Sequence, residues 1–163
     1  MQPAPGDGAP GPHTIAEVGE ADLDDLLALM RAYCDFYEVS PSDEALLALS
    51  RTLLADQARE GVQLIARDAA GVALGFATVF WSWDTTEGAR VGIMNDLYIA
   101  PSARGAGLAD ELIAACRERC AERGAARLEW MTAPDNRRAQ AVYERVGARR
   151  EPWLIYALPV AGV

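Results

Sequence analysis

The amino-acid sequence predicts an α/β fold, a central mixed sheet with helices on both faces, on three observations. Apolar residues at helical spacing alternate along the chain with short apolar runs that are typical of strands. Two of these runs are joined by the short turn DAAG, which favours antiparallel neighbours, while others are separated by helical segments, which favours parallel crossovers. At 163 residues, the chain has room for one domain with a buried core.

Turn residues and leucine spacing predict the elements of the first third of the chain. Residues 1–12 are rich in proline and glycine and are expected to form a disordered tail, so that the folded domain spans residues 13–160. The run HTIAEVG predicts a strand, and the leucine spacing that follows it predicts an amphipathic helix over 21–37. Ser42 stands where a helix N-cap is expected and predicts a second helix as far as residue 56.

The rest of the chain continues the alternation of strands and helices, without an internal repeat. Apolar runs rich in β-branched and aromatic residues predict the strands, and apolar stripes at helical spacing predict the helices. The expected order over the whole chain is therefore β-α-α-β-β-β-α-β-α-β. Beyond residue 56, the expected elements are strands 62–67, 72–83 and 89–100, helix 105–123, strand 127–131, helix 136–146 and strand 152–158.

The charge balance narrows the expected partners. Acidic residues outnumber basic ones 24 to 15, which gives a formal net charge of −9. A nucleic-acid-binding surface needs a surplus of lysine and arginine, so nucleic acid is not expected as a partner, whereas an acidic surface favours amines or basic peptides. Because no apolar run reaches the roughly 18 residues of a membrane span and no signal peptide is visible, we expect a cytoplasmic protein without membrane contact.

Histidine and cysteine usage excludes several kinds of chemistry. The one histidine, His13, adjoins the proline- and glycine-rich tail, and Cys34, Cys116 and Cys120 form no CxxC pair. A zinc site needs more ligands than these, so no metal is expected. Catalysis of the Ser-His-Asp or Cys-His type is excluded on the same ground. The two cysteines at 116 and 120 extend an apolar helix stripe and are expected in the core.

The first candidate site is the segment YIAPSARGAGLADELI, residues 98–113. Gly105 and Gly107 let backbone N–H groups approach a ligand, and the helix that follows adds unpaired N–H groups and the positive end of its dipole, which suits a pyrophosphate. Arg104 adds a charge-assisted contact. The lysine of a P-loop is absent, and Asp110 stands where a dinucleotide fingerprint needs glycine or alanine. A glycine turn without any ligand is the alternative.

A second segment, NRRAQAVYERVG, forms a second candidate motif, which follows the glycine turn along the chain. It places Asn136, Ala139 and Tyr143 on one face of one helix. The two segments together resemble the motifs of the GNAT family of N-acetyltransferases, and most closely its histone/polyamine and D-amino-acid acetyltransferases. The turn fits Arg-x-x-Gly-x-Ala, and the helix fits Asn-x-x-Ala-x-x-x-Tyr-Glu-x-x-Gly; the matching residues are Arg104, Gly107, Ala109, Asn136, Ala139, Tyr143, Glu144 and Gly147.

The resemblance implies acetyl-CoA as co-substrate, lying where strand 89–100 separates from the strand that follows it. The pantetheine arm would pair with backbone groups of strand 89–100 like an added strand, and the pyrophosphate would bind the glycine turn. Relatives often carry lysine or arginine where this chain has Ala106 and Asp110, so phosphate binding would depend on Arg104 and backbone amides. The implied cofactor-binding residues are Leu97, Ile99, Arg104, Gly105, Ala106, Gly107, Leu108, Ala109, Asp110, Asn136 and Ala139.

The implied reaction is direct attack of an amine on the thioester, which needs no protein nucleophile. Tyr143, with an unperturbed pKa of about 10, suits protonation of the leaving thiolate. Asp96 is the candidate general base, acting directly or through a water molecule. Relatives often have glutamate where this chain has Asn95, and Glu129 is a further candidate for the base.

The acceptor is expected to be a small cationic amine, because aromatic faces beside carboxylates suit an ammonium group. Two groups of residues could line its site or simply pack in the core and cap the sheet: Tyr33, Asp35, Phe36, Tyr37 and Glu38, and Trp81, Trp83, Asp84 and Glu87. The last strand, with Trp153, Ile155 and Tyr156, could complete the sheet of a homodimer or be buried within one chain. The alternative functions are a protein or peptide N-acetyltransferase and a non-catalytic acyl-CoA-binding module.

Overall fold

The computed structural model describes residues 13–160, in two compact units of which the first ends at residue 131 and the second begins at residue 132. The expected tail, residues 1–12, lies outside the described residues. The second unit holds one helix, α4 (Arg137–Arg145). The first unit holds β1 (His13–Glu17), α1 (Leu23–Phe36), α2 (Asp43–Ala55), β2 (Gly61–Asp68), β3 (Ala73–Asp84), β4 (Ala89–Ile99), α3 (Leu108–Glu122) and β5 (Leu128–Glu129).

The five strands form one mixed sheet in the order β1-β2-β3-β4-β5. The first four are antiparallel neighbours, and β5 pairs parallel to β4 after the crossover through α3. The DAAG turn between β2 and β3 is closed by Asp68, whose side chain accepts hydrogen bonds from the backbone N–H groups of Ala70 and Val72 at 2.9 Å. The predicted fold class, a mixed sheet with helices on both faces, is confirmed.

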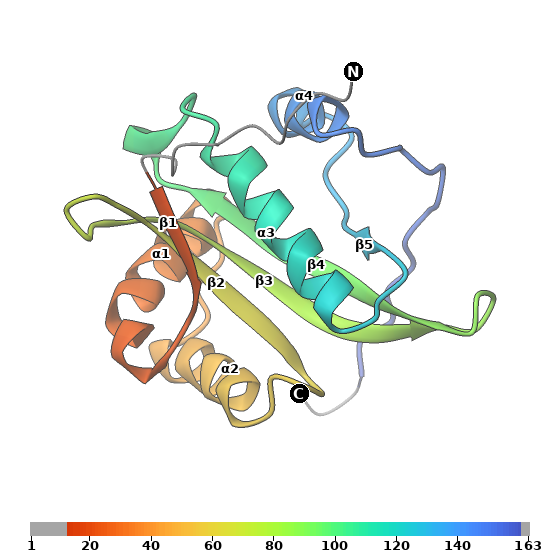
Figure 1. Cartoon of the computed structure of the whole chain (residues 1–163), viewed down its shortest axis with the longest axis horizontal. Coiled ribbons are helices and arrows are strands. Elements are labelled where there is room, and N and C mark those ends of the chain that lie inside the picture. Colours follow the sequence, from red (N-terminus) through yellow and green to blue (C-terminus); the bar gives the residue numbers. More distant parts are fainter. Residues whose placement is uncertain (1–12, 161–163) are drawn as a thin grey trace, which may run out of the picture. The chain divides into compact units, whose positions relative to one another are not determined.

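The two faces of the sheet are covered by different helices (Figure 1). On one face, the buried leucines of α1 pack with Phe76 and Tyr98 in the main core cluster. On the other face, α3 approaches β4 so closely that a Cβ at Gly92 would lie 2.4 Å from the Sγ atom of Cys120. Glycine is therefore needed at position 92 to let α3 reach the sheet. Among the described helices, none combines the length and the apolar character that a membrane crossing requires.

The structure corrects the prediction at two places. Residues 152–158 do not form a strand; Trp153 and Ile155 stand 83% and 68% exposed. The apolar run alone predicted the strand, but a strand also needs a neighbour with free backbone groups, and none pairs with these residues within 13–160. In addition, α3 begins only at Leu108, because Gly105 and Gly107 take positive φ angles of 84° and 82°.

Candidate active site

A β-bulge in β4 sets the geometry of the candidate site. Thr78 of β3 pairs with Asp96 and Val79 pairs with Met94, so that Asn95 is the extra, unpaired residue. On its other side β4 pairs with β5 only through Gly92 and Ile93. Beyond Ile93, the edge of β4 that faces β5 is therefore not paired with any strand of the described chain.

The backbone of β4 alternates between its two edges beyond the bulge. The N–H of Ala100 donates to the carbonyl of Leu74 at 2.8 Å, so Ala100 turns its N–H toward β3. In an antiparallel pair the direction alternates from residue to residue, which turns Leu97 and Ile99 toward the unpaired edge. The carbonyl of Ile99 accepts a hydrogen bond of 3.0 Å from Nε of Arg104. Leu97 keeps both backbone groups, and Ile99 its N–H, directed at that edge.

The glycine turn leads from the end of β4 into α3. Gly107 is the N-cap residue of α3, and no side chain caps the helix, so its first N–H groups are available to a ligand. A Cβ at Gly105 or Gly107 would meet nothing within 4 Å, which leaves open space in front of these amides. Leu108, in contrast, is 1% exposed, so its side chain anchors the helix in the core and only its backbone faces the turn.

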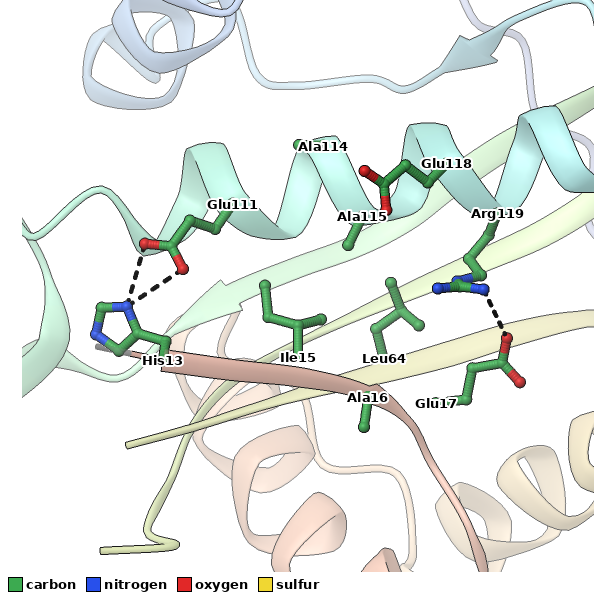
Figure 2. Close-up of a pocket in the computed structure, with 10 residues that line it drawn as sticks. All are labelled: His13, Ile15, Ala16, Glu17, Leu64, Glu111, Ala114, Ala115, Glu118 and Arg119. Atoms are coloured by element: carbon green, nitrogen blue, oxygen red, sulfur yellow. Dashed lines mark hydrogen bonds and ion pairs between the residues drawn. The ribbon is translucent and has the colours of Figure 1, made fainter. Parts of the chain in front are cut away.

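Charged side chains near the turn are engaged by neighbours. The guanidinium of Arg104 lies 6.0 Å from the centroid of the Tyr98 ring. Glu111, in the first turn of α3, hydrogen-bonds to Nδ1 of His13 at 3.2 Å. Both of these residues line a cavity of about 340 Å³ between β1 and α3, shown in Figure 2. None of the residues predicted for the site lines this cavity.

Asp96 is partly buried on the face of the sheet that α1 covers. Its Oδ1 atom accepts a hydrogen bond from Nδ2 of Asn95 at 3.1 Å. Burial raises the pKa of Asp96, and the polar groups of Thr78, Tyr33 and Asn95 oppose the rise because they favour the charged carboxylate. The pKa of the Tyr33 phenol is raised in turn, by its own burial and by the Asp96 charge. A carboxylate with a raised pKa is a stronger base than a free one.

An aromatic cluster from α1 and the sheet lies beside Asp96. The ring of Tyr33 meets Phe76, Tyr98 and Tyr37 edge to face, with the Tyr37 centroid 5.0 Å away. Phe36 and Tyr37, at the end of α1, are 61% and 52% exposed. The structure thus brings one of the two predicted acceptor groups to the candidate base, with aromatic faces open to solvent.

The second predicted acceptor group lies in a charge network at the β3–β4 hairpin. Arg127 contacts Asp84 at 2.5 Å, Glu87 at 2.9 Å and Glu129 at 2.8 Å. Hydrogen bonds from Thr86 and Arg127 hold the pKa of Asp84 well below its usual range. Since Glu129 also binds Arg127, its carboxylate is engaged in the network and is a poor candidate for a general base.

In the second unit, α4 presents the remaining predicted residues. Asn136 is the N-cap of α4, and its side chain accepts a hydrogen bond from the N–H of Ala139 at 3.2 Å. Tyr143 is partly buried, and its carbonyl accepts from Ala148 at 3.0 Å, while Gly147, with a φ of 84°, donates to Glu144. These two bonds form a Schellman motif, so the glycine of the sequence motif ends the helix.

Sequence reasoning missed two residues of the Asp96 environment, Thr78 and Gln63. Nε2 of Gln63 donates to Oγ1 of Thr78 at 3.2 Å, and both side chains are buried. The available signal was a polar residue in the middle of each of two otherwise apolar strands, VQLIAR and GFATVFW. A buried polar side chain requires a partner, but the sequence does not say which one.

Comparisons with known proteins identify the family of the chain. The model of the acetyltransferase (GNAT) family matches residues 26–148. The chain is 26% identical over 142 residues to the uncharacterized N-acetyltransferase YhfO of Bacillus subtilis, covering 87% of this chain and 93% of that protein. It is 32% identical over 116 residues to an L-methionine sulfoximine/L-methionine sulfone acetyltransferase of Pseudomonas aeruginosa, covering 68% of this chain and 65% of that enzyme.

Two solved structures have a closely similar fold. The crystal structure of a probable acetyltransferase has a TM-score of 0.81 at 30% identity, covering 92% of this chain and 99% of that one. The aminoglycoside N-acetyltransferase AAC(6')-Iy in complex with CoA has a TM-score of 0.77 at 26% identity, covering 90% of this chain and 94% of that one.

Proposed function

Because this chain belongs to the acetyltransferase (GNAT) family, we propose that it transfers the acetyl group of acetyl-CoA to the primary amine of a small cationic molecule. The observation that carries the proposal is Asp96, a partly buried carboxylate beside the point where β4 loses its pairing with β5. We take residues 13–160 as the acetyltransferase domain. With three free and buried cysteines, a reducing compartment suits the protein, and we propose the cytoplasm.

The residues of the first unit fit the chemistry of CoA. The unpaired edge of β4 offers the N–H and C=O groups of Leu97 and the N–H group of Ile99 to the amides of a pantetheine arm. The uncapped start of α3 and the glycine turn offer N–H groups and a positive dipole end to a pyrophosphate, and Arg104 adds one positive charge. In the family motif, Asn136 and Ala139 complete this set. When bound, acetyl-CoA supplies an activated thioester.

Two proton transfers then remain for the protein. The carboxylate of Asp96 takes a proton from the ammonium group of the acceptor, directly or through water, and so frees the amine to attack. As the new C–N bond forms and the C–S bond breaks, the phenol of Tyr143 donates its proton to the departing sulfur. The nitrogen loses its second proton to water as the amide forms, and solvent then removes the proton from Asp96 and returns one to Tyr143. No covalent bond to the protein is formed.

The acceptor site is proposed at the end of α1. Tyr33 and Tyr37 offer aromatic faces, Asp35 and Glu38 offer carboxylates, and the protein as a whole carries a net charge of −9. Two of the relatives act on small molecules by name, an aminoglycoside and methionine sulfoximine or sulfone. These observations favour a small amine over a protein substrate.

We also propose that the protein forms a homodimer through its C-terminal segment. Four large apolar side chains stand exposed there, and two copies could cover them: Trp153 at 83%, Leu154 at 79%, Ile155 at 68% and Tyr156 at 90%. Sedimentation equilibrium of the wild type and of Ile155→Glu measures this directly. We expect a dimer for the wild type and a monomer for the variant.

A thiol-release assay tests the proposed function. The protein is incubated with acetyl-CoA and a panel of amines that includes an aminoglycoside, a polyamine, an amino acid and a peptide with a free N-terminus. We expect thiol release with a small amine, and a loss of activity in Asp96→Asn and Tyr143→Phe. The matched controls are Asp24→Asn, on the exposed side of α1, and Tyr156→Phe, which should keep full activity.

Three other results of the thiol-release assay would each contradict one part of the proposed function. Activity with the peptide alone would make the chain a protein N-acetyltransferase. Binding of acetyl-CoA without thiol release on any amine would make it a non-catalytic acyl-CoA-binding module. Full activity of Tyr143→Phe would remove Tyr143 as the acid.

A further inference from the structure

Three polar side chains lie in one row across the middle of the sheet. Gln63 of β2 is in register with Thr78 of β3, and Thr78 is in register with Asp96 of β4. All three stand on the face of the sheet that α1 covers, since Asp96 reaches Tyr33 and Gln63 reaches Met30 of that helix. Gln63 is 3% exposed and Thr78 is fully buried.

The hydrogen bond from Gln63 to Thr78 leaves the Thr78 hydroxyl proton to be donated on the Asp96 side of the row. Nε2 of Gln63 donates to Oγ1 of Thr78 at 3.2 Å, so the Thr78 oxygen is already an acceptor. A hydroxyl group has one proton to donate, and the carboxylate of Asp96, directly opposite Thr78 in the register of β3 and β4, is the neighbouring acceptor for it. The bond from Gln63 thus fixes the orientation of the Thr78 hydroxyl.

Such a row is costly in a hydrophobic core unless it serves a purpose. Buried polar groups must be desolvated, and an apolar pair of the same shape is often nearly as stable. Valine is nearly isosteric with threonine and would fit the apolar strand around it. The row ends, moreover, on the residue to which the proposed mechanism assigns the proton of the acceptor.

We propose that Thr78, held by Gln63, is a positioning residue that orients the Asp96 carboxylate for its role as general base. The inference rests on the proposed function of Asp96. Thr78 approaches the carboxylate from β3, Tyr33 approaches it from α1 with Tyr37 beyond it, and Asn95 donates from β4 itself. The titratable groups that face Asp96 in the first unit are these two phenols, with the Tyr98 ring two residues along β4. Thr78 is therefore the donor that is both buried and fixed.

The test compares Thr78→Val with Thr78→Ser and measures two quantities. The first is the pH dependence of kcat/KM for acetyl transfer. Loss of the hydrogen bond raises the pKa of Asp96, so the acid limb of the Thr78→Val profile should move up by about one pH unit, with activity on that limb about tenfold lower. Activity well above the limb should approach that of the wild type, and Thr78→Ser should restore the wild-type profile.

The second quantity is the titration of the Asp96 carboxyl in the free protein, followed by NMR with carboxyl-labelled aspartate. It needs no substrate, so it decides about Thr78 even if the protein transfers no acetyl group. We expect a higher titration midpoint in Thr78→Val, and a smaller shift of the same sign in Gln63→Met, which keeps the hydroxyl but releases it. Thr52→Val is the matched control, because Thr52 is exposed on α2 and its hydroxyl donates to the carbonyl of Ala48 in the same helix.

The outcomes separate the inference from the function on which it rests. An unchanged Asp96 midpoint in both Thr78→Val and Gln63→Met overturns the positioning role. A shifted midpoint with an unchanged pH profile of kcat/KM overturns the link to catalysis. Full activity of Asp96→Asn removes Asp96 as the base and leaves the hydrogen bond to be judged by NMR alone.

Discussion

Replacing Gly107 with alanine tests whether the turn before α3 is built to bind a ligand. Gly107 has a φ of 82°, in the left-handed region, and an added Cβ would meet nothing within 4 Å. A left-handed alanine lowers the free energy of unfolding by roughly 1–2 kcal/mol. The smaller conformational entropy of alanine in the unfolded chain offsets about 0.4–1 kcal/mol of this loss. The free energy of unfolding should therefore fall by about 1 kcal/mol, which lowers Tm by about 2–4 °C for a chain of this size.

The same helix offers a matched control at its other end. Gly124 follows α3 with a φ of 66°, and its added Cβ would also meet nothing within 4 Å. It closes a Schellman motif, in which Gly124 donates to Ala121 and Ala125 donates to Cys120. Gly124→Ala should thus lose about as much stability as Gly107→Ala, without touching the start of the helix.

The two variants should differ in their affinity for acetyl-CoA. At position 107, the new methyl group occupies space that a pyrophosphate needs in order to reach the amides of α3. Losing one hydrogen bond to a charged group costs about 1.5–3 kcal/mol, which corresponds to a Kd about ten to a hundred times higher. Urea unfolding gives the stabilities, and calorimetric titration with acetyl-CoA gives the affinities. Equal affinities in the two variants, at equal loss of stability, would refute the assignment of the turn as the pyrophosphate site.

Three further changes test other parts of the structure. In differential scanning calorimetry, Asp96→Asn should melt at a higher temperature than the wild type at pH 7 but not near pH 3. The raised pKa of Asp96 favours folding below the unfolded-state pKa of about 3.9, and this contribution to stability is lost as the pH rises through the folded-state pKa. A difference in melting temperature that does not depend on pH would contradict the burial of the Asp96 carboxylate. Gly92→Ala should lower the free energy of unfolding by about 1–3 kcal/mol in urea, because its Cβ would lie 2.4 Å from Sγ of Cys120. The double variant with Cys120→Ala should be more stable than the sum of the two single changes predicts. Strict additivity would show that this contact does not limit the packing of α3 on the sheet. In steady-state kinetics, Arg104→Gln should raise the KM for acetyl-CoA and leave kcat almost unchanged. The reason is that Arg104 is proposed to bind the pyrophosphate and not the reacting atoms. A fall in kcat with an unchanged KM would assign Arg104 another role.

Much of the fold was predictable because local chemistry decides it. Ser42 caps α2 through a hydrogen bond from the N–H of Ala45, as its position before the leucine stripe indicates. The DAAG turn and the glycine turn could also be predicted from the sequence, since each uses residues that favour its backbone conformation. Within the candidate site, the same local logic pointed to Gly105 and Gly107, whose φ angles are positive.

What the sequence could not supply depends on pairing between distant strands. The bulge at Asn95 shifts the register between β3 and β4, and it turns Asp96 to the face of α1, where strand alternation alone left its direction open. Thr78 and Gln63 reach Asp96 only because three strands are in register. The same limit explains the wrong strand at 152–158, since an apolar run does not identify the surface that would pair with it.

We propose above all that the protein moves an acetyl group from acetyl-CoA directly to a small amine. The most direct measurement is the mass and amount of the products when wild-type protein, acetyl-CoA and the most active amine of the panel are incubated together. We expect equal amounts of N-acetylated amine and free CoA, with the mass of the protein unchanged. Free CoA without acetylated amine, or an acetyl group found on the protein, would contradict it.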